Sequence, residues 1–208
     1  MSAQSVIEVF ADVWCPFTHV GLRAAVQQRA ASRRTDVAIH VRAWPLELVN
    51  GTPMAVEGAA HHAHDLREQV SPDLFGHLDL DHFPTTTLPA LALTAAAYRQ
   101  SPVTGEAVAF ALRDAMFEHG LDISDPAVLD DLRRTHAVDE PTDADRASVL
   151  ADWDEGKRRG VQGSPHFFCG ADDMFCPSLT ITRDEASQLT ITRNAERLAE
   201  FLHRCLSR

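Results

Sequence analysis

A strand-like apolar run passes directly into a helical segment at Cys15. Residues 5–10 (SVIEVF) are rich in Val and Ile and predict a short buried strand. Pro16 suits the first turn of a helix, where its missing N–H would have no partner, and the Ala-rich residues after it predict a helix to about Ala31. Residues 36–41 (DVAIHV) predict a second strand. The chain therefore starts with a β-α-β unit that carries a cysteine between strand and helix.

The middle of the chain is helical in pattern. From about residue 50 to residue 160 the apolar spacing favours helices, and strand signals are weak. Asp125 followed by Pro126 predicts an N-cap and a first helical turn. The clearest helical segments are 88–99, 105–120 and 125–137, and a further helix is expected to end near residue 159. Residues 51–87 are expected to be partly loop.

Strand signals return at Gly163. The predicted segments are a strand at 163–168, a turn near 170–173, a strand at 174–182 that completes a hairpin, and a final amphipathic helix at 194–206. The string LTITR occurs at 179–183 and again at 189–193, either as two paired short strands or by coincidence. The whole order predicts an α/β fold, with one sheet covered by helices on both sides and a helical insertion between its halves.

Composition and charge narrow the classes of function. The chain has 208 residues and a formal net charge of −11, which argues against nucleic acid or an anionic membrane as a partner. No apolar run approaches the ~18 residues of a membrane span. The start, MSAQSVIEVFADVW, has no basic segment followed by a long apolar one, so we expect no signal peptide. The four cysteines then predict a reducing, cytoplasmic location in which cysteine is catalytic or inert.

Cys15 carries the strongest chemical signal. A thiol at a helix N-terminus meets unpaired backbone N–H groups and the positive end of the helix dipole, and both favour the thiolate. Such settings lower the pKa of cysteine, and the thiolate is the nucleophile of disulfide exchange. The alternative is that Cys15 is a small buried hydrophobic residue.

Ser164 and Pro165 carry the second signal. The sequence GVQGSPHFF places a Ser-Pro pair just before an apolar strand, where a cis peptide bond is readily accommodated. If this loop faces Cys15, the backbone of Ser164 could pair with an extended peptide or a thiol ligand as a strand edge does. Taken alone, the segment is an ordinary turn.

Together these segments resemble the DsbA-like branch of the thioredoxin superfamily. The matching motifs are D-x-x-C-P-F-x-x-x-G at residues 12–21, FEHGLDISDPAVL at 117–129 and G-V-Q-G-S-P at 160–165. The similar proteins are FrnE-type oxidoreductases, kappa-class glutathione transferases and 2-hydroxychromene-2-carboxylate isomerases. The resemblance implies a thioredoxin fold interrupted by an all-helical insertion.

The resemblance also implies domain boundaries, a thiol cosubstrate and an oligomeric state. The thioredoxin-like domain would comprise residues 1–48 and 160–208, and the helical insertion residues 49–159. No tightly bound cofactor is expected, and glutathione or another low-molecular-weight thiol would serve as cosubstrate. Some members of these families are homodimers.

Thr18 departs from the pattern of the dithiol members. Those members have C-P-x-C, whereas this chain has C-P-F-T, so Thr18 replaces the resolving cysteine. Self-contained dithiol cycling within the motif is therefore not expected. Thr18 can still donate a hydrogen bond to the Cys15 thiolate and lower its pKa. The isomerases and kappa-class transferases carry serine at the first position of the motif, so Cys15 departs from them as well.

Three functions remain open. Cys15 acts as the nucleophile of a thiol–disulfide oxidoreductase, or the helix N-terminus stabilises the thiolate of a bound cosubstrate in an isomerase or transferase, or the protein binds a partner without catalysis. In the first case the catalytic pair is Cys15 with Thr18. The substrate groove would be formed by Trp14, Pro16, Phe17, His19, Ser164 and Pro165.

Some of these groove residues have a second interpretation. His19 either lies near Cys15 and stabilises the thiolate when protonated, or points to solvent at the start of the helix. Trp14 and Phe17 either wall an apolar substrate groove or pack in the core.

The remaining cysteines and a histidine run have weaker signals. If a two-residue turn forms at Asp172-Asp173, Cys169 and Cys176 would face each other and could form a disulfide, with two free thiols as the alternative. Cys205 is expected to pack in the core. The run HHAH at residues 61–64 lacks the spacing and the third ligand of a zinc site, so a solvated polar turn and no metal are predicted.

Overall fold

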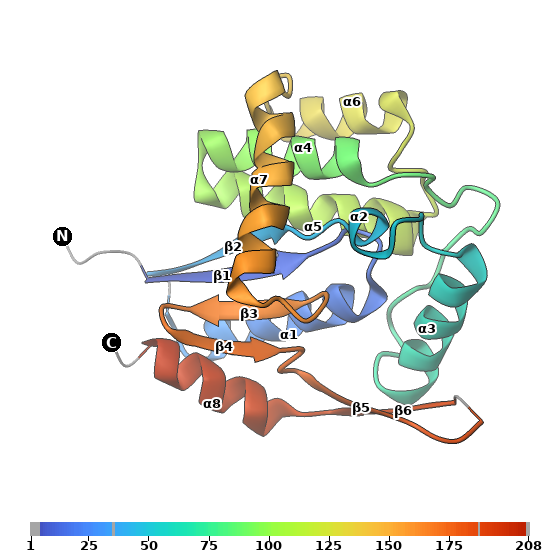
Figure 1. The fold of residues 1–208 in the computed structure, drawn as a ribbon, viewed down its shortest axis with the longest axis vertical. Coiled ribbons are helices and arrows are strands. Elements are labelled where there is room, and N and C mark those ends of the chain that lie inside the picture. Colours follow the sequence, from blue (N-terminus) through green and yellow to red (C-terminus); the bar gives the residue numbers. More distant parts are fainter. Residues whose placement is uncertain (1–4, 35, 187, 207–208) are drawn as a thin grey trace.

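The computed structural model describes residues 5–34, 36–186 and 188–206 (Figure 1). Residues 1–4, 35, 187 and 207–208 of the predicted thioredoxin-like domain lie outside the described part. The first four also begin the segment in which no signal peptide is expected. The elements in chain order are β1 (Ser5–Ala11), α1 (Pro16–Ala31), β2 (Val37–Ala43), α2 (Leu46–Asn50), α3 (Val56–Gln69), α4 (Leu88–Gln100), α5 (Pro102–His119), α6 (Pro126–Thr135), α7 (Asp143–Arg159), β3 (His166–Cys169), β4 (Asp172–Phe175), β5 (Leu179–Arg183), β6 (Leu189–Arg193) and α8 (Ala195–Leu206).

The main sheet is mixed and has the strand order β2-β1-β3-β4. β1 runs parallel to β2 and antiparallel to β3, and β3 runs antiparallel to β4. Alternate residues of β1 therefore face opposite sides. Ile7 and Val9 belong to an apolar cluster with residues of α1 and α8. Phe10 packs with Trp44 and Phe168 in a separate cluster on the side of α7, which crosses the sheet in Figure 1.

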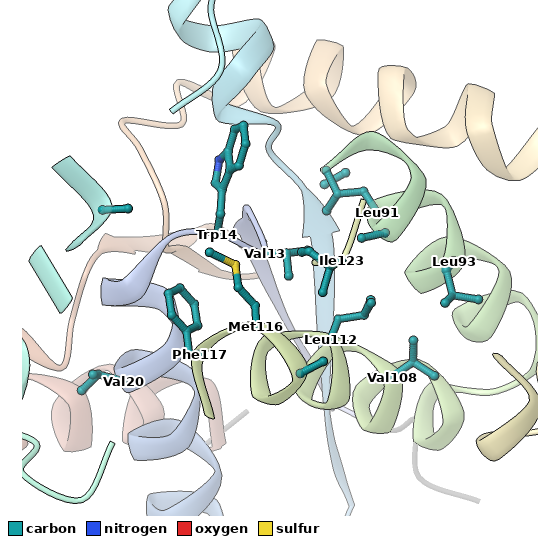
Figure 2. Packing of buried hydrophobic residues seen from close by; sticks show 14 of the residues in the cluster. Val13, Trp14, Val20, Leu91, Leu93, Val108, Leu112, Met116, Phe117 and Ile123 are labelled. Atoms are coloured by element: carbon teal, nitrogen blue, oxygen red, sulfur yellow. The ribbon is translucent and has the colours of Figure 1, made fainter. Parts of the chain in front are cut away.

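The predicted α/β fold with a helical middle is confirmed. Within the described residues, every regular element between β2 and β3 is a helix. A large apolar cluster joins these helices to the β1–α1 junction, and Figure 2 shows Val13 and Trp14 beside Met116 and Phe117 of α5. The loop that carries Cys15 is thus anchored on the helical part of the molecule.

The histidine run lies on a helix, so the prediction of a solvated polar turn is wrong. Residues 61–64 fall inside α3. The buried residues of α3 are Ala59, Ala63 and Leu66, whose spacing places them on one helical face. Two of the three are alanines, which is a weak apolar signal in a sequence otherwise rich in histidine and acidic residues. Within the described residues, no group of three or more His, Cys, Asp or Glu could hold a metal ion.

The β3–β4 hairpin differs in register from the prediction. Its two-residue turn is Gly170-Ala171, because Gly170 supplies the positive φ of 62° that a tight hairpin turn favours. Cys169 therefore pairs with Asp172 instead of facing Cys176, and all four cysteines are free.

The expected strand at 174–182 is interrupted. β4 ends at Phe175 and β5 starts at Leu179, so the chain leaves the main sheet between them. β5 and β6, the two LTITR copies, pair with each other as a separate antiparallel hairpin in which Ile181 lies opposite Ile191. This hairpin is held against α3, where Gln69 accepts a hydrogen bond from the Ile191 N–H at 2.7 Å. None of the described helices is long and apolar enough to cross a membrane.

Candidate active site

Cys15 lies at the N-cap of α1 with an extended backbone, φ −79° and ψ 112°. Its carbonyl accepts hydrogen bonds from the Thr18 N–H at 3.1 Å and from the His19 N–H at 3.2 Å, which close the first helical turn. Its Sγ–H donates to the carbonyl oxygen of Ser164 at 3.0 Å. The side chain is only 4% exposed. The thiol is therefore held at a helix N-terminus but is covered in this state.

Ser164 and Pro165, joined by a cis peptide bond, form the loop opposite Cys15. Ser164 Oγ accepts a hydrogen bond from the Asp12 N–H at 2.9 Å and lies 2.8 Å from Thr18 Oγ1. Because Ser164 Oγ already accepts from Asp12, its own hydrogen is free to be donated to Thr18. The Thr18 hydroxyl can then donate to the Cys15 sulfur, with which it interacts. A chain of donors thus runs from the Asp12 N–H, directly after β1, through Ser164 and Thr18 to the sulfur.

The expectation of a lowered pKa at Cys15 is wrong for this state. Burial raises the pKa of the Cys15 thiol, and the hydroxyls of Thr18 and Ser164 offset that rise only in part. The negative charge of Asp12 raises it further. The structure therefore holds Cys15 as a thiol until something changes its contacts.

Asp12 and Arg113 are buried polar residues that support the loop carrying Cys15. The Asp12 carboxylate accepts from the backbone N–H of Val13 at 2.6 Å and also from that of Leu46. Its burial raises its pKa to about 6. Arg113 of α5 donates from Nη2 to the Asp12 carbonyl at 3.0 Å, so a helix of the insertion supports the active-site loop.

The buried guanidinium of Arg113 interacts electrostatically with Asp12 and Cys15. Burial lowers the pKa of Arg113 to about 10, and the negative charges of Asp12 and Cys15 act in the opposite direction. The guanidinium therefore lies within electrostatic range of both groups. Sequence reasoning missed Arg113, although the charged pair Arg113-Asp114 inside the otherwise apolar run AVAFALRDAMF was an available signal.

His19 occupies neither of its two expected positions. Its ring is fully buried, and its Nε2 lies 2.6 Å from Glu118 Oε1. Its Nδ1 lies 3.0 Å from Arg23 Nη1. Because arginine only donates, Nδ1 accepts, and the Nε2–H donates to Glu118. Both ring nitrogens are therefore engaged by α1 and α5, and burial lowers the pKa of His19 despite the nearby Glu118.

Trp14 packs in the core, so its assignment to the groove wall is wrong. The indole is fully buried and stacks on Phe83, with ring centroids 6.2 Å apart. It belongs to the cluster of Figure 2. Pro16 is buried at the first position of α1, and Pro165 is buried close to Gly21.

A cleft of about 360 Å³ borders Ser164, whose carbonyl accepts the hydrogen bond of the covered thiol. Its lining comes from the first turn of α1, from α3, from the loop before β3, from the end of β4 and from the β5–β6 hairpin. The lining residues are Phe17, His62, Ser164, Phe175, Cys176, Ile181, Thr182, Arg183 and Leu189. The structure thus places Phe17 and Ser164 at the cleft. His62 and Cys176 were not predicted there, because strands and helices distant in sequence bring them in.

Solved structures match this chain over nearly its whole length, whereas no family model and no curated protein matches it. The cytosolic disulfide reductase DsbM from Pseudomonas aeruginosa is 15% identical, with a TM-score of 0.66 over 97% of this chain and 98% of that one. DsbM solved with GSH is 16% identical, with a TM-score of 0.63 over 98% of this chain and 100% of that one. The chain has the DsbA-like thioredoxin fold.

The same fold is found in an isomerase. 2-Hydroxychromene-2-carboxylate isomerase is 12% identical, with a TM-score of 0.56 over 82% of this chain and 88% of that one. The DsbA-like fold therefore agrees with the resemblance seen in the sequence. At these identities it fixes the architecture, and the chemistry has to be argued from the site.

Proposed function

We propose that this chain is a thiol–disulfide oxidoreductase in which Cys15 is the nucleophile. The observation that carries the proposal is the placement of the Cys15 sulfur. It lies at the N-terminus of α1, is hydrogen-bonded to the Ser164 carbonyl, and is the end point of the donor chain through Ser164 and Thr18. A thiol surrounded by donors can become a thiolate once its own acceptor is taken away.

Substrate binding supplies that change. An extended substrate pairs with the Ser164 backbone as an added strand, and its N–H donates to the Ser164 carbonyl in place of the Cys15 Sγ–H. The displaced thiol gives its proton to solvent, and the Thr18 hydroxyl and the helix N-terminus stabilise the thiolate. Cys15 then attacks one sulfur of the substrate disulfide, a mixed disulfide forms, and the other sulfur leaves as a thiolate.

The cleft beside Ser164 suits a substrate with apolar groups. Phe17, Phe175, Ile181 and Leu189 contribute apolar surface to it. The proposed cosubstrate is glutathione or another low-molecular-weight thiol. A thiol attacks Cys15 Sγ in the mixed disulfide and expels the reduced substrate, and two molecules of the cosubstrate supply the two electrons overall and leave as one disulfide. The DsbM neighbour solved with GSH supports this class of cosubstrate, and the neighbour's cytosolic location supports a reducing compartment for this chain.

The test compares the native protein with Cys15→Ser. The reduced protein is exposed to glutathione disulfide, and loss of the free thiol at Cys15 is measured by alkylation and peptide mass. Reduction of a disulfide substrate is followed in parallel with glutathione as the electron source. We expect Cys15 to react and Cys15→Ser to fall to the uncatalysed rate.

The other outcomes separate the alternative functions. Turnover of an isomerase substrate that saturates with glutathione and survives Cys15→Ser would assign the site to cosubstrate activation. A Cys15 that reacts with no disulfide, in a protein without turnover on either substrate set, would leave a binding role. Both results contradict the proposal.

A further inference from the structure

Cys176 lies at the same end of the main sheet as Cys15 and the Ser164-Pro165 loop. β1 is antiparallel to β3, and β3 is antiparallel to β4. The last residues of β1, the first of β3 and the last of β4 therefore lie at the same end of the sheet (Figure 1). Cys15 follows β1, Pro165 precedes β3 and Cys176 follows β4. The topology thus brings a second cysteine to the site from a part of the chain remote from the motif.

The two cysteines are hydrogen-bonded to consecutive carbonyls of one loop. The Cys15 Sγ–H donates to the carbonyl of Ser164 at 3.0 Å. The Cys176 N–H donates to the carbonyl of Pro165 at 2.9 Å, which extends the β3–β4 ladder by one pair beyond His166 and Phe175. Cys176 is also part of the lining of the cleft that contains Phe17 and Ser164.

The thiol of Cys176 is sensitive to the charge on Cys15. Burial raises the pKa of Cys176 to about 12, and the negative charge of Cys15 contributes to the rise. The two sulfurs are therefore within electrostatic range of each other. Cys176 also has φ +44°, a conformation that non-glycine residues rarely adopt and that occurs often at functional positions.

The other two cysteines belong to a different part of the structure. Cys169 pairs with Asp172 in the hairpin, and its thiol interacts with that of Cys205. Both lie in the apolar cluster on the α8 side of the sheet. Thr18, at the usual resolving position, bears a hydroxyl that is engaged with Ser164.

We propose that Cys176 is the resolving thiol of this protein and that it closes a disulfide with Cys15. The inference rests on the proposed function, because it needs the mixed disulfide at Cys15. In that intermediate Cys15 has released the Ser164 carbonyl, and its sulfur no longer carries a charge that suppresses ionisation of Cys176.

The step is an ordinary thiol–disulfide exchange. The Cys176 thiol loses its proton to solvent, and its sulfur attacks Cys15 Sγ. The bond between Cys15 and the substrate sulfur breaks, and that sulfur leaves as a thiolate and takes up a proton. The substrate disulfide has then gained two electrons, and the two protein thiols have lost them as one disulfide. Two molecules of a low-molecular-weight thiol return the protein to its reduced state and become one disulfide.

The experiment follows the full-length protein after mixing with glutathione disulfide. Samples are quenched with an alkylating reagent and read by intact mass and by mapping of disulfide-linked peptides. The native protein should lose two hydrogens, yield a peptide linked between Cys15 and Cys176, and accumulate no glutathione adduct. Cys176→Ser should accumulate one glutathione adduct on Cys15, whose lifetime lengthens by at least about tenfold because a tethered thiol has a high effective concentration.

Cys169→Ser is the matched control, since it removes the other buried cysteine of the same hairpin. It should behave as the native protein does. If Cys176→Ser fails to fold, as judged by thermal unfolding, the peptide map of the native protein and the variant Cys176→Ala decide the question.

The outcomes separate this inference from the proposed function. A native protein that accumulates the Cys15 adduct as long as Cys176→Ser does overturns the role of Cys176 and leaves Cys15 as the nucleophile. A linkage only between Cys169 and Cys205 also overturns it. The absence of both adduct and linkage at Cys15 overturns the proposed function together with the inference.

Discussion

Two pairs of cysteines in this protein lie in contrasting surroundings. Cys15 and Cys176 are hydrogen-bonded to the carbonyls of the Ser164-Pro165 loop, next to a cleft. Cys169 and Cys205 interact with each other between β3 and α8, in an apolar cluster. All four side chains are buried.

The contrast shows that burial does not decide the chemistry of a thiol. Burial raises the pKa of Cys15, Cys176 and Cys205 alike. What distinguishes Cys15 is a set of donors beside the sulfur and an acceptor that a substrate can take over. The core pair instead lies among apolar side chains of β1, α1 and α8. Substitutions in the two pairs should therefore have different effects.

The largest expected effect compares Cys15→Ser with Cys205→Ser. Cys15→Ser should reduce disulfide reduction to the uncatalysed rate with little change in stability, because serine can donate the same hydrogen bond to Ser164. Cys205→Ser should retain activity and lose about 1–3 kcal/mol of unfolding free energy, because it buries a hydroxyl among apolar groups. Enzyme assays and chemical denaturation measure the two. Activity loss in Cys205→Ser without unfolding would contradict the division.

Asp12 should make stability depend on pH near the active site. Its pKa rises from 3.8 to about 6 in the folded protein, so the folded state holds this proton more tightly than the unfolded state does. The contribution to stability is therefore present in full below pH ~4 and is lost as the pH rises through 6, by about 3 kcal/mol.

Asp12→Asn isolates this contribution from those of other titrating groups. The variant should be less stable at low pH, because its amide has a single acceptor oxygen, whereas both oxygens of the protonated Asp12 carboxyl group can accept from Val13 and Leu46. The difference in unfolding free energy between the native protein and the variant should shrink between pH 4 and pH 7. Denaturant titrations at several pH values measure it, and a difference independent of pH would refute the assignment.

Thr18→Val should weaken the reactive environment alone. It removes the hydroxyl that lowers the pKa of Cys15, so that pKa should rise. Alkylation of Cys15 at neutral pH should slow by about tenfold, since a hydrogen bond to a charged group contributes ~1.5–3 kcal/mol. Thr18→Ser, which keeps the hydroxyl, is the control and should react as the native protein does. Equal rates for Thr18→Val and Thr18→Ser would show that the donor chain is not functional.

The smallest expected effect concerns the cleft. The ring of His62 lies against Phe17, with centroids 5.1 Å apart, and both residues line the cleft. His62→Ala should raise KM for a disulfide substrate roughly two- to fivefold and leave kcat unchanged, because an aromatic contact contributes ~0.5–1.5 kcal/mol. His64→Ala, on the same helix and outside the cleft lining, is the control. A change confined to kcat would contradict a binding role.

Local sequence signals predicted much of the fold. The β1–α1–β2 unit follows from strand-forming residues and from Pro16 at the first helical position. Asp125 caps α6 as expected, with its side chain accepting from the Ala127 N–H. α3 was missed because its buried face consists largely of alanine, and the hairpin turn was misplaced because two adjacent aspartates resemble a turn as strongly as Gly170 does.

The candidate site was likewise predicted only in part from the sequence. The sequence predicted the pairing of Cys15 with the Ser164-Pro165 segment through recognisable motifs. It left open whether Trp14 packs in the core, as it does, and it did not predict that His19 points toward Glu118. The direction of side chains around the start of a helix depends on which other elements pack there. Here those elements are α5, which carries Glu118, and the segment before α4, which carries Phe83.

The sequence by itself determined the strand–helix junction that places a thiol at a helix N-terminus, because that junction depends on neighbouring residues and on backbone preferences. Only the tertiary structure decided what surrounds the thiol. Burial raised the pKa of Cys15, Arg113 reached the motif from the insertion, and the end of the sheet shared by β1, β3 and β4 brought Cys176 to the site. These features depend on contacts between residues far apart in the chain, which local sequence patterns do not encode.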